Sequence, residues 1–305
     1  MNGKNDKIEP VFIINPAART YSKAGEALIR TVFPSALIRH TQCHGDGTRI
    51  ALEILSENTS DKIVLVPCGG DGTFREVAQA VGSRIRIAIG PMGTVNQIGA
   101  QLGTCSIKDT LSALKDGVEV PVYPGLARFE GEEVWRMFFI GVSAGPDADA
   151  VGLVNKRLKK IAGGVAYAAA FFRRMARGVE PVVECTISGT DNAGTFRASQ
   201  VIALANGLYG GKFMFASNLG PEDTHVEVAH TNGGRFGVTG FFLASMVPGK
   251  KEGSTIRISG GELVMRLPDE GDFQIDGDAV RARAVTIRPS PEAVRILVPR
   301  YRKNS

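Results

Sequence analysis

The first 120 residues alternate between short apolar runs and segments with helical spacing, and this alternation constrains the fold more than any other feature. Continuous apolar runs are typical of strands buried on both faces of a parallel sheet. Such runs lie at 11–14 and 63–66, two further short strand segments lie at 36–38 and 85–89, and the helical segments lie at 23–33, 46–55, 73–81 and 107–114. The pattern predicts an α/β domain over residues 1–120, with a doubly wound, mostly parallel sheet.

After residue 120 the pattern changes to period-2 and β-branched runs separated by glycine and asparagine turns. These runs lie at 134–140, 181–187, 200–205, 226–229, 255–258, 262–266 and 285–287. They predict a β-rich antiparallel sandwich over residues 121–290, interrupted by one helical insertion at about 151–177. A last apolar run, 294–298, lies in a C-terminal segment, 291–305, that we expect to return to the first domain.

The charge balance is basic, with 36 Lys and Arg against 31 Asp and Glu among 305 residues, a net charge of +5. Such an excess leaves nucleic acid, an anionic membrane surface and a phosphorylated ligand open as partners. The four cysteines are far apart and form no CxxC pair, which argues against zinc and against a disulfide framework. No apolar run is long enough to span a bilayer and the N-terminus lacks a signal-peptide core, so we expect a cytoplasmic protein.

The strongest chemical signal is a loop with three glycines that follows the third predicted strand and opens a helix. It reads Gly69-Gly70-Asp71-Gly72-Thr73. Glycines let backbone N–H groups approach a phosphate closely, and a helix N-terminus favours negative charge. The alternative is a helix start with turn glycines, since neither the Walker pattern nor the dinucleotide GxGxxG pattern is present.

Two further polar loops follow strands of the same domain. One contains Gly93, Thr94 and Asn96, and the other begins with Asn15 and Pro16. Because the carboxyl ends of parallel strands meet at one edge of a sheet, the three loops together favour an anion-binding site.

The motifs, taken in order, resemble the diacylglycerol kinase catalytic-domain family, which includes bacterial lipid kinases, sphingosine kinases and ceramide kinases. The Gly-Gly-Asp-Gly-Thr motif alone is shared with NAD kinases and phosphofructokinases, whereas the ordered series is more specific. The matching segments are Asn15-Pro16, Thr41 with Gly45-Asp46, 69–73 with Glu76, 91–96, 164–167, 205–211 and Asp276-Gly277-Asp278.

The resemblance implies an NAD kinase-like first domain and ATP binding between the two domains. It also implies that Asp278 accepts the proton of a lipid hydroxyl while Asp276 supports it or holds Mg²⁺, a role open to Asp71 as well. A second Mg²⁺ would lie at Glu222 and Asp223, which replace the family's usual Asp-Gly. The implied nucleotide site comprises Asn15, Pro16, Ala17, Ala18, Arg19, Thr41, Gly69, Gly70, Asp71, Gly72, Thr73, Phe74, Arg75, Gly93, Thr94 and Asn96.

The chain departs from the family pattern at Arg19, Arg75 and Gln97, and it carries Asp278 where the family has glutamate. Taken by themselves, residues 276–278 are equally a β-turn, since Asp-Gly is a common turn pair. Two functions therefore stay open. One is an ATP-dependent lipid kinase acting on diacylglycerol, ceramide or a sphingoid base, and the other is an inactive nucleotide- or lipid-binding protein of the same fold.

The helical insertion carries seven basic residues and no acidic residue between positions 156 and 177. Such a segment favours transient, peripheral contact with an anionic membrane, although a solvated basic face over a packed helix is the alternative. Nucleic acid is the weaker expectation because no recognised motif accompanies the charge. A homodimer stays open.

Overall fold

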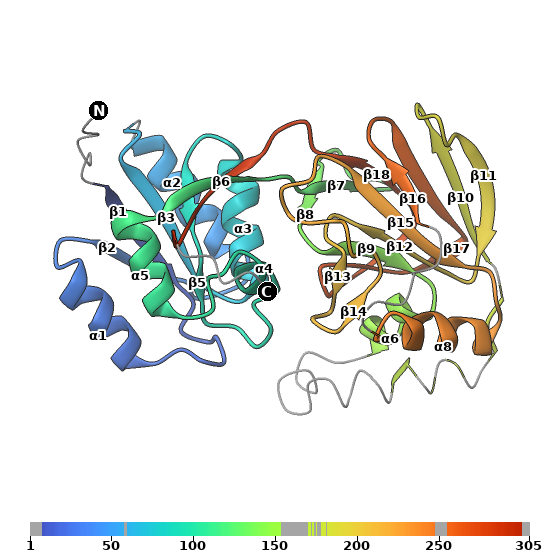
Figure 1. Ribbon diagram of the computed structural model, residues 1–305, viewed down its shortest axis with the longest axis horizontal. Helices are drawn as coiled ribbons and strands as arrows, with labels where there is room; N and C mark the ends of the chain where they lie inside the picture. Colours follow the sequence, from blue (N-terminus) through green and yellow to red (C-terminus); the bar gives the residue numbers. More distant parts are fainter. Residues whose placement is uncertain are drawn as a thin grey trace. The chain divides into compact units, whose positions relative to one another are not determined.

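The computed structural model describes residues 8–57, 60–153, 178–180, 182–247 and 255–300, together with residues 170, 171, 173 and 175. Two compact units are present, one made of Met1–Val122 with Glu292–Ser305 and the other of Tyr123–Pro291. Each unit has its own sheet (Figure 1). Within the described ranges, every helix is too short or too polar to cross a bilayer.

The first unit contains a seven-stranded sheet whose main order is β2-β1-β3-β4-β19-β6, with β5 beside β3. Neighbouring strands are parallel except for β19 and β6. This confirms the predicted mostly parallel sheet, and the buried pattern of β3 explains its continuous apolar run. The strands are β1 (Glu9–Ile14), β2 (Leu37–His40), β3 (Ile63–Gly69), β4 (Arg86–Ala88), β5 (Gly90–Pro91), β6 (Val118–Val122) and β19 (Val294–Val298).

Helices cover both faces of this sheet (Figure 1). Ile29 of α1 and Leu111 and Leu114 of α5 share a core with Phe12 and Val64 on one face. Helices α2 and α3 pack against each other on the opposite face. The helices are α1 (Lys23–Val32), α2 (Asp46–Glu57), α3 (Asp71–Val81), α4 (Gln97–Gln101) and α5 (Ile107–Asp116).

The second unit is built on a ten-stranded antiparallel sheet, as the period-2 pattern predicts. Strand β17 is the longest, and its register against β18 shifts between Arg266 and Gly271. Its first half pairs with β10 and its second half with β9, so one strand serves two parts of the sheet. The strands are β7 (Gly125–Phe129), β8 (Arg136–Phe138), β9 (Gly141–Ala144), β10 (Val183–Ser188), β11 (Gly194–Ala198), β12 (Gln200–Leu204), β15 (Val226–Thr231), β16 (Ile256–Ile258), β17 (Glu262–Ile275) and β18 (Asp278–Pro289).

Two helices of the second unit differ from the sequence expectation of a single insertion. Helix α6 (Pro146–Leu153) starts before the expected insertion, which itself lies almost wholly outside the described residues. Helix α8 (Arg235–Ala244) was not predicted, because it is apolar nearly all round and lacks the two-sided pattern of a surface helix. It packs on a small hairpin formed by β13 (Leu208–Tyr209) and β14 (Phe213–Met214).

Candidate functional site

The three polar loops of the first unit follow β1, β3 and β5, which run parallel and end at the same edge of the sheet. Asn15 follows β1, and its backbone N–H donates to the carbonyl of Cys68 in β3. The loop that follows β2 is also bonded to β1, because the N–H of Thr41 donates to the carbonyl of Ile14 at 2.9 Å. These backbone bonds therefore place the polar loops at one edge of the sheet, as the sequence predicts.

The two glycine loops are packed so tightly that their glycines are required. A Cβ on Gly93 would lie 2.4 Å from the Cα of Gly70, and a Cβ on Gly69 would lie 2.3 Å from Oγ1 of Thr73. The N–H of Met92 also donates to the carbonyl of Gly69 at 2.7 Å. Backbone thus meets backbone between the loops, which leaves no room for a side chain.

Asp71 ties the first glycine loop to the helix that follows the second. Its carboxylate accepts from the N–H groups of Gln97 (3.1 Å) and Ile98 (3.3 Å) at the start of α4. Burial raises the pKa of this carboxyl, against the lowering effect of the two backbone donors. The geometry therefore gives Asp71 a structural role, since its carboxylate holds the start of α4.

Two asparagines hold the remaining loops. Asn96 has a left-handed backbone, with φ of 48°, and its amide closes a ring with Gly93 by accepting at 2.8 Å and donating at 3.0 Å. Asn15 accepts from the N–H of Ala17 at 2.9 Å and donates to Oγ1 of Thr73 at 3.5 Å. Both predicted nucleotide ligands thus shape the loops.

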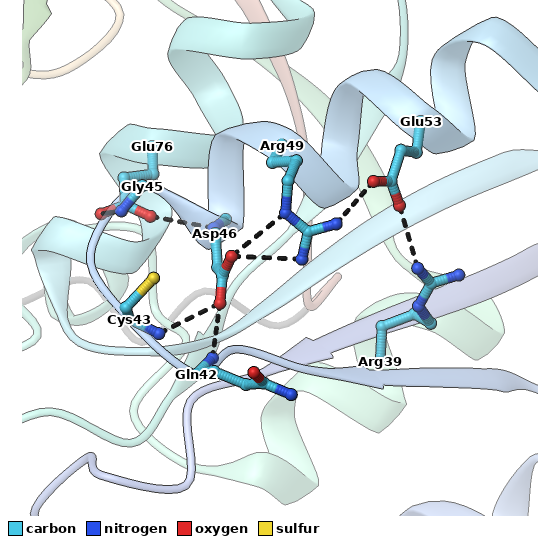
Figure 2. Close-up of polar contacts among 9 residues, drawn as sticks. Arg39, Gln42, Cys43, Gly45, Asp46, Arg49, Glu53 and Glu76 are labelled. Atoms are coloured by element: carbon cyan, nitrogen blue, oxygen red, sulfur yellow. Dashed lines mark hydrogen bonds and ion pairs between the residues drawn. The ribbon is translucent and has the colours of Figure 1, made fainter.

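Two carboxylates organise the loop between β2 and α2 (Figure 2). Asp46 accepts from the N–H groups of Gln42 (2.6 Å) and Cys43 (3.0 Å), and these bonds lower its pKa to about 2. Glu76 of α3 accepts from the N–H groups of Gly45 and Gly47, both at 3.0 Å. Because Glu76 lies one turn beyond the glycine loop, this loop is coupled to the glycine loop as well.

The part of the site that faces outward is Gly72 with the start of α3. A Cβ on Gly72 would meet no atom of the described chain within 4 Å, and the N-cap residue of α3, Gly70, has no side chain to cap the helix. A cradle with uncapped N–H groups and no side chain is what a phosphate requires. The Phe74 side chain is buried, and its predicted contact with the nucleotide stays a prediction.

The remaining predicted nucleotide ligands differ in how exposed they are to solvent. Arg75 is half-buried on α3, and Thr41 and Thr73 are buried. A small cavity of about 10 Å³, room for a single water, lies beneath the glycine loops and is lined by Asp71 and Asn96 among others. The exposed set is Pro16, Ala17, Arg19 and Thr94, and Ala18 is half-buried.

In the second unit, Asp276 and Gly277 form the two-residue turn between β17 and β18. Both have positive φ, 47° and 83°, as a type I′ hairpin turn requires. The Asp276 carboxylate accepts from the N–H groups of Phe139 (2.9 Å), Ile140 (2.9 Å) and Gly141 (3.0 Å). Asp278 begins β18 with an exposed side chain. The turn is thus anchored by one aspartate and presents the other.

A buried polar chain reaches this turn from the interior of the unit. The Tyr209 hydroxyl donates to Asp147 and accepts from Gln274, and Ser143 donates to Asp147 at 2.6 Å. The amide oxygen of Gln274 in turn accepts from the N–H of Gly277 at 2.6 Å. Burial raises the pKa of Asp147, and burial together with the Asp147 charge raises that of Tyr209 well above its usual value.

The sequence analysis did not identify these four buried polar residues, although the positions of Asp147 and Gln274 in the sequence indicate that their side chains are buried. Asp147 stands in a run of small and apolar residues, and Gln274 lies between Phe273 and Ile275 in a strand. Polar side chains in such places are buried only when they are paired. Ser143 and Tyr209 come from other elements, and only the fold brings the four together.

The predicted second metal site is not supported. Asp223 accepts from the N–H of Gly220 at 2.7 Å and so closes its own turn, while the Glu222 side chain is exposed. No group of three His, Cys, Asp or Glu side chains suited to a metal ion occurs in the part of the chain that the structure describes. We therefore derive no step through a metal at this turn.

Comparisons with known proteins agree with this arrangement. The "Probable lipid kinase YegS-like" protein of Pseudomonas aeruginosa is 25% identical over 308 residues, covering 96% of this chain and 95% of the relative. A diacylglycerol kinase of Staphylococcus epidermidis is 29% identical over 169 residues, about half of each chain. These relatives are lipid kinases by name, which are transferases.

Solved structures share the fold. A diacylglycerol kinase from Bacillus anthracis matches with a TM-score of 0.71 at 17% identity, covering 97% of this chain and 98% of that one. An NAD kinase from Archaeoglobus fulgidus, solved in complex with ATP, matches with a TM-score of 0.51 at 12% identity, covering 96% and 95%. At these identities the likeness concerns the fold, and it confirms the predicted fold class.

The family model of the diacylglycerol kinase catalytic domain matches residues 9–125, the stretch that holds all three polar loops. The motif series thus finds its counterpart in an independent comparison. Residues 9–125 match the family model of the diacylglycerol kinase catalytic domain, and this confirms the resemblance drawn from the motifs.

Proposed function

We propose that the protein is an ATP-dependent kinase that transfers the γ-phosphate to a hydroxyl of a membrane lipid such as diacylglycerol, ceramide or a sphingoid base. The observation that carries this proposal is the side-chain-free cradle at Gly72, held in shape by the packed glycines 70 and 93. Phosphoryl transfer needs positioning and charge neutralisation more than covalent chemistry, and such a cradle supplies positioning.

The nucleotide would bind at the loop edge of the first unit. The uncapped N–H groups at the start of α3 would receive a phosphate, and exposed Arg19 would add positive charge nearby. ATP ordinarily carries Mg²⁺ on its phosphates, where it neutralises charge, and Mg²⁺ needs few protein ligands of its own in such complexes. Asp71 and Asp276 would be the carboxylates available to that ion, and each also accepts bonds from backbone N–H groups.

Asp278 would act as the proton acceptor. Its carboxylate takes the proton of the lipid hydroxyl while that oxygen bonds to the γ-phosphorus, and the bond to the bridging oxygen of ADP breaks. Asp276 would hold the turn through its three backbone bonds. Brief, peripheral contact with an anionic membrane belongs to this proposal, because the acceptor is dissolved in a bilayer.

The experiment is a transfer assay with radiolabelled ATP and a panel of diacylglycerol, ceramide and sphingosine in mixed vesicles. Asp278→Asn should abolish labelling while ATP binding, measured by calorimetry, stays unchanged. Asp278→Glu is the matched control, because it restores a carboxylate one methylene longer and should retain activity. Retained ATP binding with no labelled lipid in the wild type would favour the inactive binding protein and overturn the kinase.

A further inference from the structure

Helix α8 of the second unit exposes apolar side chains on the face that points away from the protein. Phe236 is 79% exposed, Leu243 59% and Val247 53%. Their spacing of seven and four residues places them on one line along the helix and the turn that follows it. A soluble surface helix normally carries charged or polar residues on such a line.

The inner face of the same helix is fully committed to packing. Phe241 stacks on Phe215 at a centroid distance of 4.7 Å, and Phe242 meets Phe215 edge-on at 5.5 Å and Phe213 at 5.2 Å. Strand β14 is bonded to the end of the helix, since the N–H of Met214 donates to Ser245 at 2.8 Å. The helix therefore packs on its unit through residues other than the exposed apolar ones.

Exposed apolar residues gather here more than elsewhere. Of the twelve large apolar side chains that are exposed among the described residues, five fall between positions 214 and 247, namely Met214, Phe236, Leu243, Met246 and Val247. We call these five the α8 surface. Single exposed apolar residues are ordinary, whereas a contiguous group marks a binding surface. Figure 1 shows α8 along the outside of its unit.

The two segments that form the α8 surface carry basic side chains and no acidic one. Residues 232–247 contain one charged side chain, Arg235, and residues 205–219 contain one, Lys212, so neither segment has an acid. The Arg235 guanidinium lies over the ring of Phe236, 4.8 Å from its centroid. Positive charge at the rim of an apolar surface complements an anionic bilayer, where rings enter the headgroup layer and cations stay outside.

We infer that the α8 surface docks on an anionic lipid bilayer, with Phe236 and Leu243 entering the headgroup layer and Arg235 contacting lipid phosphates. This inference rests on the proposed function insofar as a lipid kinase must reach its acceptor in a membrane. It differs from the basic insertion at 151–177, because it is carried by apolar residues of another element.

The test is flotation of the full-length protein with vesicles of phosphatidylcholine containing 30% phosphatidylglycerol, without ATP or acceptor lipid. The wild type should float with the vesicles. The double variant Phe236→Ser/Leu243→Ser should lose affinity by about tenfold or more, because two large apolar side chains no longer leave water. Arg235→Gln should weaken binding about fivefold on these vesicles and leave binding to pure phosphatidylcholine unchanged.

Val134→Ser is the matched control, because Val134 is 68% exposed in the same unit but lies outside the α8 surface. It should float as the wild type does, and thermal melts should show that all variants are folded. Unchanged flotation of the double variant, or a wild type that never floats, would overturn the inference. A dimer in solution that the double variant dissociates, with flotation intact, would show that a second copy covers this surface instead.

This assay separates the two proposals because it requires no catalysis. Flotation that depends on Phe236 and Leu243, in a protein that labels no lipid, would sink the kinase and keep the docking surface. Lipid labelling by a protein whose flotation does not depend on Phe236 and Leu243 would support the kinase and overturn the docking surface.

Discussion

The two parts of the proposed site are held in place by different means. At the loop edge of the first unit, glycines approach one another and short polar side chains bond to nearby backbone. At the Asp276-Gly277 turn of the second unit, a buried chain of side chains from four elements holds the backbone. The residues that support the first part lie close together in the sequence and form recognisable motifs. The residues that support the second part lie far apart in the sequence.

The largest effect is expected where backbone meets backbone. Gly93→Ala places a methyl group 2.4 Å from the Cα of Gly70, and this nearest atom belongs to the backbone, which cannot move aside as the end of a side chain can. We expect a loss of about 3 kcal/mol in the free energy of unfolding, measured by urea denaturation. Gly194→Ala is the control, because a Cβ there meets nothing among the described residues. Equal stability of the two variants would refute the tight contact.

The buried chain gives the next effect. Tyr209→Phe removes the hydroxyl that joins Asp147 to Gln274, so the amide of Gln274 loses its buried acceptor. We expect a loss of about 2 kcal/mol in stability and faster hydrogen exchange at the N–H of Gly277. Ser143→Ala should be milder, because Tyr209 still donates to Asp147. If hydrogen exchange at the N–H of Gly277 is unchanged in Tyr209→Phe, the buried polar residues do not stabilise the turn.

Gly72→Ala should act in the opposite direction on stability. The added methyl group meets no described atom, and alanine is the better helix former, so we expect a gain of about 0.5 kcal/mol. ATP affinity should fall at the same time, because the methyl group occupies the phosphate cradle. Calorimetric titration with ATP, beside a thermal melt, checks both. A variant that binds ATP as the wild type does would place the phosphates elsewhere.

Two carboxyls, one in each unit, should give opposite slopes of stability against pH. The lowered pKa of Asp46, about 2, contributes stability above its unfolded pKa near 4, and this is lost as pH falls toward 2. The raised pKa of Asp147 contributes stability below its unfolded pKa, and this is lost as pH rises through the folded value. Asp46→Asn should therefore flatten the acid loss, whereas Asp147→Asn should remove the opposite trend in urea unfolding followed from pH 2 to 7. Parallel curves for the two variants would contradict both assignments.

Much of the first unit could be predicted from the sequence. Strands β1 and β3 are buried on both faces and have the sequence of apolar runs, and the predicted helices begin and end within a few residues of the expected positions. Strand β6 was missed because its outer residues are polar or exposed and it pairs only with the last strand of the chain.

The second unit shows where sequence reasoning stops. Helix α8 has no polar face, so periodicity offers no signal for it. The roles of the motif residues were only partly predictable. Asp71 and Asn96 bond to backbone, and Phe74 turns into the core, because a motif names residues without saying which side chains face outward.

Strand β19 has a consequence for how the protein is made. It lies between β4 and β6, so the first unit is assembled from both ends of the chain, with the second unit inserted between them. A ribosome has therefore released all of residues 123–291 before the interior of the first sheet is complete. Chains that stop short of residue 294 lack the strand that joins β4 to β6, although the residues of the loop edge that would hold ATP are synthesised first.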